Sequence, residues 1–250
     1  GLAGFALAVV WWRFYQPAEL PTDINATSLP CAEAPVPRMG YGQLLRNPTC
    51  LALCFGRLLT DATNYFFAFW LPDYLQHGRG FSLALIGSVG WLPFLAADIG
   101  GPGGGFLSDH LVRRGCSSVR ARLVLMGGAA LVMPLAMAVV RVDAAWLALA
   151  LMAVVLAAQS CWMANQLALI SESAPRNAVA TLVAVSAMAG GIGGIVANLI
   201  AGRMIAAHGY FLVFSVVGWA HLIAWLVLAV AFGGRLYNRW NPAETSPPAL

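Results

Sequence analysis

The sequence has 250 residues, of which 60% are hydrophobic and only 10% are charged. Soluble domains carry roughly 25% charged residues, so an ordinary water-soluble domain is excluded. Nine Trp, twelve Phe and six Tyr are too many for an intrinsically disordered chain. The net charge of +4 comes from 14 basic residues, all arginine, and 10 acidic ones. The arginines separate apolar stretches and do not cluster on one polar face, which argues against nucleic-acid binding.

The chain begins with an apolar segment, residues 1–12, about half as long as a membrane span. Trp11, Trp12 and Arg13 at its end suit a helix leaving the bilayer and do not resemble the small-residue cleavage site of a signal peptide. We therefore expect the end of a transmembrane helix here. A polar, proline-bearing loop over residues 13–47 follows and is the candidate domain linker.

Six apolar stretches come next, each about 18 to 27 residues long, which is enough to span a hydrocarbon core of about 30 Å. They cover residues 50–71, 83–107, 123–140, 144–170, 178–201 and 211–233. Their continuous apolar character favours helices over the alternating strands of a β-barrel. The sequence thus predicts an all-α, polytopic membrane protein with six complete spans in residues 48–233 and a polar tail at 234–250.

The first span carries a polar stripe. Arg57 and Asp61 lie four residues apart on one helical face, where they can form an ion pair. Asn64 and Tyr65 continue this face one turn further. Ionisable groups inside spans are costly and indicate function, but the alternative, which we favour for Arg57, is an Arg–Asp clamp near the cytoplasmic interface. We therefore expect Asn64 and Tyr65, nearer mid-membrane, to contact a substrate.

Asp98 in the second span is a candidate for proton exchange, because we expect it to be buried and burial favours the protonated form of a carboxyl. The alternative is that it hydrogen-bonds to backbone or polar groups that the following glycine-rich segment leaves without partners.

In the fourth span, Gln159 and Trp162 share a face that Asn165 flanks. Amides beside an indole suit the hydroxyls and apolar side of a polyol, although interhelical hydrogen bonding also explains them.

Glycine placement indicates an internal repeat. Residues 100–105 in the second span and 190–194 in the fifth are both glycine-rich, so the second helix of each three-helix set carries such a cluster. This is the pattern of a three-plus-three repeat. Small residues let helices approach closely, and we favour this packing role over direct substrate contact.

The arginines also predict the orientation of the chain. Ten lie in the loop over residues 13–47, in the turn after the second span, between the fourth and fifth spans, and in the tail, whereas only Arg79, Arg141 and Arg203 lie on the opposite side. By the positive-inside rule, the long loop and the C-terminus face the cytoplasm.

The histidines and cysteines are scattered along the chain and form no catalytic or metal-binding pattern. We therefore expect no enzyme activity, no metal and no cofactor.

A motif over residues 105–114 occupies a tight cytoplasmic turn between the second and third spans. It resembles the signature loop of the major facilitator superfamily of transporters, and the matching residues are Gly105, Leu107, Ser108, Asp109, Arg113 and Arg114. His110 and Val112 depart from the usual basic residue and glycine, which fits the second, degenerate copy of that loop. The resemblance implies that Asp109 and the two arginines help to latch the cytoplasmic side.

Further stretches resemble the anion:cation symporter family, whose members include hexuronate, galactonate and glucarate permeases. Residues 57–61, 66–75, 86–87 and 91–100 are similar to its seventh and eighth helices, and residues 162–165, 188–194 and 209–210 to its tenth to twelfth. The resemblance implies that residues 1–12 end helix six, that residues 13–47 form the central cytoplasmic loop, and that the rest is the C-terminal six-helix bundle. The N-terminal six-helix half would be its partner.

Two functions remain open at this point. The resemblance implies a secondary active transporter in the inner or plasma membrane that imports a small organic anion, a sugar acid, together with protons by alternating access. Its substrate-binding residues would be Asn64, Tyr65, Gln159, Trp162 and Asn165, and Arg57, Asp61 and Asp98 would be the ion-pair or coupling candidates. The alternative is a six-helix membrane interaction module without transport activity.

Overall fold

The computed structural model describes residues 2–14, 41–174 and 177–233. The chain divides into two units, residues 1–37 and 38–250. The first unit contains α1 (Leu2–Phe14), where the sequence predicts the end of a helix. The predicted tail lies outside the described residues, as does most of the predicted loop over residues 13–47. From that loop, the structure describes a short helix, α2 (Tyr41–Leu44).

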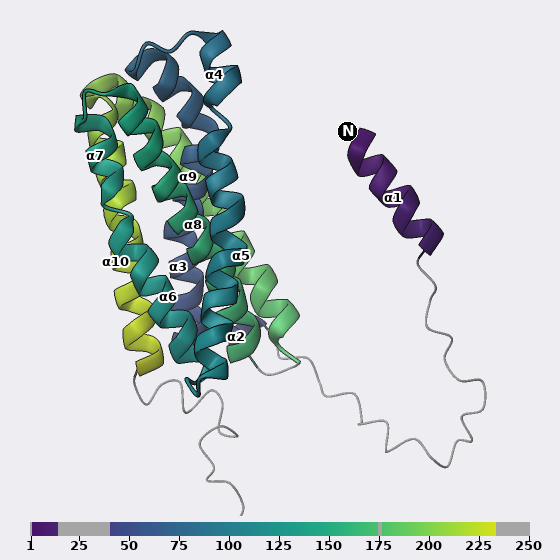
Figure 1. The fold of residues 1–250 in the computed structure, drawn as a ribbon. Helices are drawn as coiled ribbons and strands as arrows, with labels where there is room; N and C mark the ends of the chain where they lie inside the picture. Colours follow the sequence, from purple (N-terminus) through teal and green to yellow (C-terminus); the bar gives the residue numbers. More distant parts are fainter. Residues whose placement is uncertain (1, 15–40, 175–176, 234–250) are drawn as a thin grey trace, which may run out of the picture. The chain divides into compact units, whose positions relative to one another are not determined.

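Every predicted span in the second unit is helical (Figure 1). The six spans correspond to α3 (Pro48–Asp73), α4 with α5 (Leu83–Val89 and Leu92–Arg113), α6 with α7 (Ser118–Val132 and Leu135–Arg141), α8 (Ala145–Ser173), α9 (Val179–His208) and α10 (Tyr210–Gly233). The helices extend past most predicted ends, because in lipid a backbone satisfies its polar groups best by remaining helical.

Five of the described helical segments are long and apolar enough to cross a membrane. The exception is α3, which has 26 residues, or about 39 Å of helix, and therefore has the length but a lower hydropathy. Its polar side chains include Thr60, Asp61 and Thr63, which are buried inside the bundle. These three polar groups thus face protein and not lipid, which allows a less apolar helix in this position.

Local sequence explains where the helices start and break. Asn47 caps α3 by accepting hydrogen bonds from the backbone of Thr49 and Cys50, and Pro48 occupies the first helical position. Pro134 has no backbone N–H and separates α6 from α7. In contrast, Pro102 lies inside α5 without ending it.

The predicted tight turn over residues 105–114 is wrong in extent. Helix α5 continues to Arg113, so most of the motif forms its last turns. The actual turn is confined to the few residues before α6, where Gly115 adopts a φ of 96° that other residues rarely adopt. The sequence of the motif therefore marks a helix end and not a loop.

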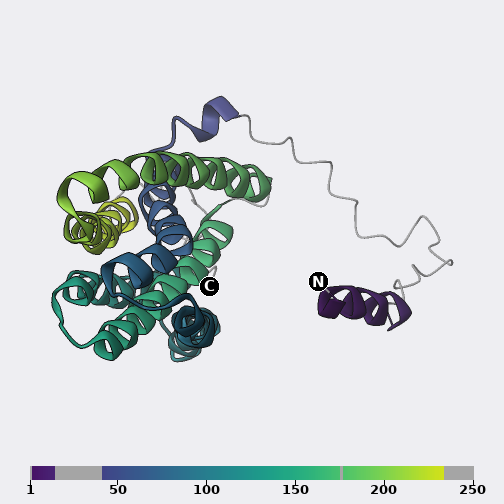
Figure 2. The ribbon, with the colours of Figure 1, turned by 90° about the horizontal axis from the view of Figure 1, so that it is seen from above.

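The helices pack in a reciprocal pattern. Helices α5 and α6 pack on α8, whereas α9 and α10 pack on α3. Seen from above, α3 and α8 lie between α9 and α10 on one side and α5 and α6 on the other (Figure 2). The second and third helices of each set thus contact the first helix of the other set, as a three-plus-three repeat would produce.

Glycines allow close backbone contacts in both of these helix pairs. A Cβ at Gly193 of α9 would overlap the carbonyl oxygen of Leu58 in α3, and one at Gly100 of α5 would overlap the carbonyl oxygen of Ala157 in α8. Both glycine clusters therefore serve packing, as predicted from their small size. The core between the helices is filled by buried aromatic and aliphatic side chains, including Phe66, Trp162 and Phe214.

Replacing Gly193 with alanine tests the contact between α3 and α9. Because the new methyl group meets the backbone of α3, we expect the free energy of unfolding to fall by about 1–3 kcal/mol, measured by thermal unfolding of the full-length protein in detergent. Gly191→Ala is the matched control, since a Cβ at Gly191 meets nothing within 4 Å. Equal stability of the two variants would contradict the close packing at Gly193.

Candidate functional site

The predicted ion pair in α3 is present. The Nε and Nη2 atoms of Arg57 lie 2.8 and 2.7 Å from Oδ2 of Asp61. Asp61 is buried where α3 meets α9, and a Cβ at Gly190 would overlap its carboxylate. Oδ1 of Asp61 is buried without a hydrogen-bond partner in the described residues. The glycine thus makes room for a charged group that the arginine neutralises.

Three predicted residues from three helices gather at one pocket. Asn64 of α3, Asp98 of α5, and Gln159 and Ser160 of α8 line a pocket of about 230 Å³ whose other walls are apolar. Gln159 is anchored, because its Nε2 donates to the Thr60 carbonyl at 3.1 Å, while its Oε1 has no partner in the described residues. The pocket therefore combines a carboxylate, two amides and a hydroxyl.

Asp98 differs from the prediction in one respect. The sequence suggested a buried carboxylate, but the side chain is exposed in the described bundle. The reason is that α5 packs on α8 through its glycine face, Gly100, Gly101 and Gly104, which leaves much of the rest of the helix uncovered. Asp98 lies at the border between these two faces.

A second, larger pocket adjoins the first one. It measures about 510 Å³ and includes Arg57, Asp61 and Gln166. Ser160 and Met163 line both pockets, so the two are adjacent along α3, α5 and α8, and we refer to them together as the hollow. This hollow, defined by the residues of the two pockets, brings Asn64, Gln159, Arg57, Asp61 and Asp98 to a common surface.

Tyr65 lies elsewhere. Its ring packs against Gly194 of α9 and stacks on Phe69, with ring centroids 6.4 Å apart. It lines a separate pocket between α3 and α9 that also includes Asn198. Asn64 and Tyr65 are adjacent in sequence, yet they face different helices.

Trp162 and Asn165 are completely buried. The indole Nε1 of Trp162 donates to Oε1 of Gln166 at 3.0 Å, and its ring meets His221 of α10 edge to face. Oε1 of Gln166 also accepts from the Thr60 hydroxyl at 3.2 Å, which joins α8 to α3. Nδ2 of Asn165 donates to the Cys161 carbonyl. The polar face of α8 is thus divided between the hollow and an interhelical network.

The signature residues form a charged cluster at one end of the bundle. Ser108 is buried and accepts a hydrogen bond from Arg122 of α6. The same guanidinium lies 2.8 Å from Asp109 of α5 and 2.8 Å from Glu172 of α8. Arg113 and Arg114 are exposed at this end. The sequence analysis missed Arg122 and Glu172 as partners, since they lie far apart in the chain.

The opposite end has its own polar cluster, which no short motif reveals. The hydroxyl of Tyr74 donates to the Val139 carbonyl at 2.9 Å, and Arg79 donates to the carbonyls of Val139 and Val142. These bonds satisfy the C-terminal carbonyls of α7. Nearby, the hydroxyl of Tyr210 donates to Asp73 at 2.6 Å. The cluster ties α3, α7 and α10 together.

Within the described residues, no group of three His, Cys, Asp or Glu side chains could hold a metal ion. The profile of the major facilitator superfamily matches residues 1–198. The chain belongs to the major facilitator superfamily. The multi-pass arrangement of its helices agrees with this membrane-transporter family.

Curated relatives in this superfamily are sugar-acid transporters by name. The chain is 28% identical over 233 residues to the probable galactarate/D-glucarate transporter GudP of Bacillus subtilis, covering 84% of this chain and 50% of that one. It is 25% identical over 226 residues to the D-galactonate transporter of Escherichia coli, covering 84% and 52%. It is 31% identical over 140 residues to the probable galactarate/D-glucarate transporter GarP of Escherichia coli, covering 49% and 32%. The chain thus spans about half the length of these relatives, or less.

A solved structure shows the same fold. The crystal structure of a bacterial homologue of the human lysosomal transporter Spinster, inward-facing and unoccupied, aligns with a TM-score of 0.53 at 16% identity. The alignment covers 99% of this chain and 59% of that chain. The major facilitator fold implied by the sequence resemblance is confirmed.

Removing the Arg122 guanidinium tests the charged cluster. Arg122→Gln leaves Asp109 and Glu172 without their shared cation. We therefore expect the free energy of unfolding of the full-length protein, measured by thermal unfolding, to fall by about 2 kcal/mol. High salt should narrow the difference from wild type, because Asp109 is more than half exposed. Arg203→Gln, at an exposed arginine of α9, is the control. An Arg122→Gln variant as stable as this control would contradict the bridging role.

Proposed function

We propose that this chain is the C-terminal half of a secondary active transporter for a small organic anion, a sugar acid. The observation that carries the proposal is the hollow, where Asn64 and Ser160 present neutral hydrogen-bonding groups beside Asp98, and the buried amide of Gln159 completes the polar lining. Polyhydroxy carboxylates offer many hydroxyls, and amides both donate to and accept from them. The names of the relatives support this substrate class.

The hollow supplies little free positive charge. Arg57 lines it, but two of its nitrogens are engaged by Asp61. The cation that binds the substrate carboxylate would therefore come from the N-terminal six-helix bundle, which we propose as the partner of residues 48–233. Substrate would lie between the two bundles near the midplane, and rocking of the bundles would expose it to each side in turn.

The predicted binding residues divide into two groups under this proposal. Asn64 would contact substrate directly, and Tyr65 would do so only from the neighbouring pocket with Asn198. Gln159, Trp162 and Asn165 would support the wall from behind, because all three are buried. Asp98 is the coupling candidate best placed to exchange a proton, since Asp61 is held by Arg57.

The proposed orientation places the charged cluster on the cytoplasmic side. Exposed Arg113 and Arg114 lie there, as the positive-inside rule requires, and the C-terminus would face the cytoplasm of a cell with this protein in its inner or plasma membrane. Gly105, Ser108 and Asp109 would then form one half of a cytoplasmic latch that contacts the N-terminal bundle.

Uptake measurements test the substrate class and the coupling. Cells or proteoliposomes with the full-length protein should accumulate labelled galactarate, galactonate or glucuronate, and a protonophore should abolish accumulation. Uptake that persists without a proton gradient would refute proton coupling. Absence of uptake for all three acids, with folded protein in the membrane, would refute the sugar-acid assignment.

Asn64→Ala tests the hollow as the binding site. The loss of one hydrogen bond to substrate should raise the KM for uptake about fivefold, because such a bond contributes about 1 kcal/mol. Ser186→Ala is the control, since this buried hydroxyl donates to the Val183 carbonyl of its own helix. Identical KM values for the Asn64 and Ser186 variants would place the site elsewhere.

Asp98→Asn tests the coupling candidate. This variant should lose proton-driven accumulation of substrate while exchange of substrate across the membrane continues.

A further inference from the structure

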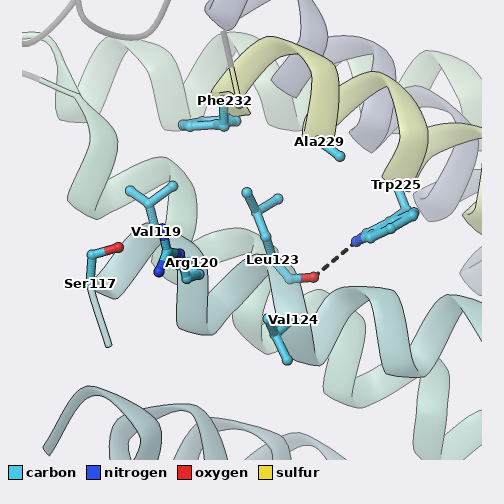
Figure 3. Close-up of a pocket in the computed structure, with 9 residues that line it drawn as sticks. Ser117, Val119, Arg120, Leu123, Val124, Trp225, Ala229 and Phe232 are labelled. Carbon is cyan, nitrogen blue, oxygen red and sulfur yellow. Dashed lines mark hydrogen bonds between the residues drawn. The ribbon is translucent and has the colours of Figure 1, made fainter. Parts of the chain in front are cut away.

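A second hollow lies between α6 and α10. It measures about 660 Å³ and is lined by apolar side chains of both helices, with Arg120 and Ser117 near the start of α6 (Figure 3). Val119, Leu123 and Val124 form one wall, and Ala229 and Phe232 form the other. None of its lining residues belongs to the hollow proposed for the sugar acid. We call this feature the α6–α10 groove.

A specific contact closes one end of the groove. The indole Nε1 of Trp225 donates to the Leu123 carbonyl at 2.9 Å, shown as the dashed line in Figure 3. This position depends on Gly127, because a Cβ there would lie 2.8 Å from the indole nitrogen. Trp225 is therefore fixed against α6. From Trp225 the groove extends along both helices toward Gly233 and Ser117.

The surroundings of the groove are those of a lipid-facing surface. Large apolar side chains near it are exposed, including Val124 at 55%, Leu226 at 56% and Val230 at 72%. The groove runs from Ser117 to Val124 along α6, about 10 Å of helix. This length fits within one leaflet, whose hydrocarbon is about 15 Å deep.

The charge at the mouth of the groove is positive. Arg120 is exposed there, and Arg113 and Arg114 are exposed at the same end of the bundle. None of the described residues that line the groove is acidic. The acidic groups close to this end, Asp109 and Glu172, are already bound by Arg122. An occupant with an apolar chain and an anionic head therefore matches the groove.

We infer that the α6–α10 groove binds an anionic phospholipid, with one acyl chain between Leu123 and Phe232 and the phosphate beside Arg120. The lipid belongs to the leaflet at the end that carries Arg113 and Arg114. Anionic lipids are abundant in the cytoplasmic leaflet, which agrees with the proposed orientation. The site is separate from the transport hollow, so it does not depend on which substrate is carried.

Native mass spectrometry of the full-length protein tests the site. The detergent-solubilised protein is titrated with phosphatidylglycerol or phosphatidylcholine of identical acyl chains. We expect one phosphatidylglycerol to bind at least fivefold more tightly than phosphatidylcholine. Arg120→Gln should lower the ratio of these two affinities about fivefold. Arg203→Gln, at an exposed arginine of α9, is the control and should retain the preference.

The apolar part of the site is tested by filling it. Ala229→Trp should displace both lipids, whereas Ala150→Trp at an exposed alanine of α8 should not. Val119→Trp fills the same groove from α6 and replaces Ala229→Trp if that variant does not fold. Equal affinity for the two lipids in the wild type would overturn the proposal. Retention of phosphatidylglycerol by the filled variants would also overturn it, because binding would then reflect surface charge alone.

Discussion

The close approach of α9 to α3 and of α5 to α8 is the constraint on which the rest of the bundle depends. Gly193 allows the backbone of α9 to reach the Leu58 carbonyl, and Gly100 does the same for α5 at Ala157. Helices in lipid gain no hydrophobic driving force from one another, so such packing stabilises their association. It also places α3 and α8 at the centre, where their polar faces converge on the same hollow.

Polar side chains inside this bundle have two uses, and their neighbours decide between them. Thr60 and Gln166 join α3 to α8 through a hydrogen bond, with Trp162 as a further donor. Gln159, seven residues before Gln166 on α8, donates to the Thr60 carbonyl and also lines the hollow. The same helix face thus stabilises the fold and supplies the proposed binding site.

The two ends of the bundle are closed by different means. At one end Arg122 joins three helices through Asp109 and Glu172, and exposed arginines surround it. At the other end Tyr74 and Arg79 bond the last carbonyls of α7. The charged cluster and the mouth of the α6–α10 groove therefore lie at the same end of the bundle.

The sequence alone determined the class, the six spans and the family resemblance, because apolar length, arginine placement and a local motif are properties of neighbouring residues. It also predicted the Arg57–Asp61 pair, which depends only on helical spacing. Tertiary structure decided which polar residues are accessible: Asn64 and Tyr65 are adjacent yet face different helices, Trp162 is buried, and Asp98 is exposed. Periodicity specifies a face of a helix, but only packing specifies what covers it. For the same reason, the partners of Arg122 and the groove beside Trp225 emerged only when distant segments were brought together.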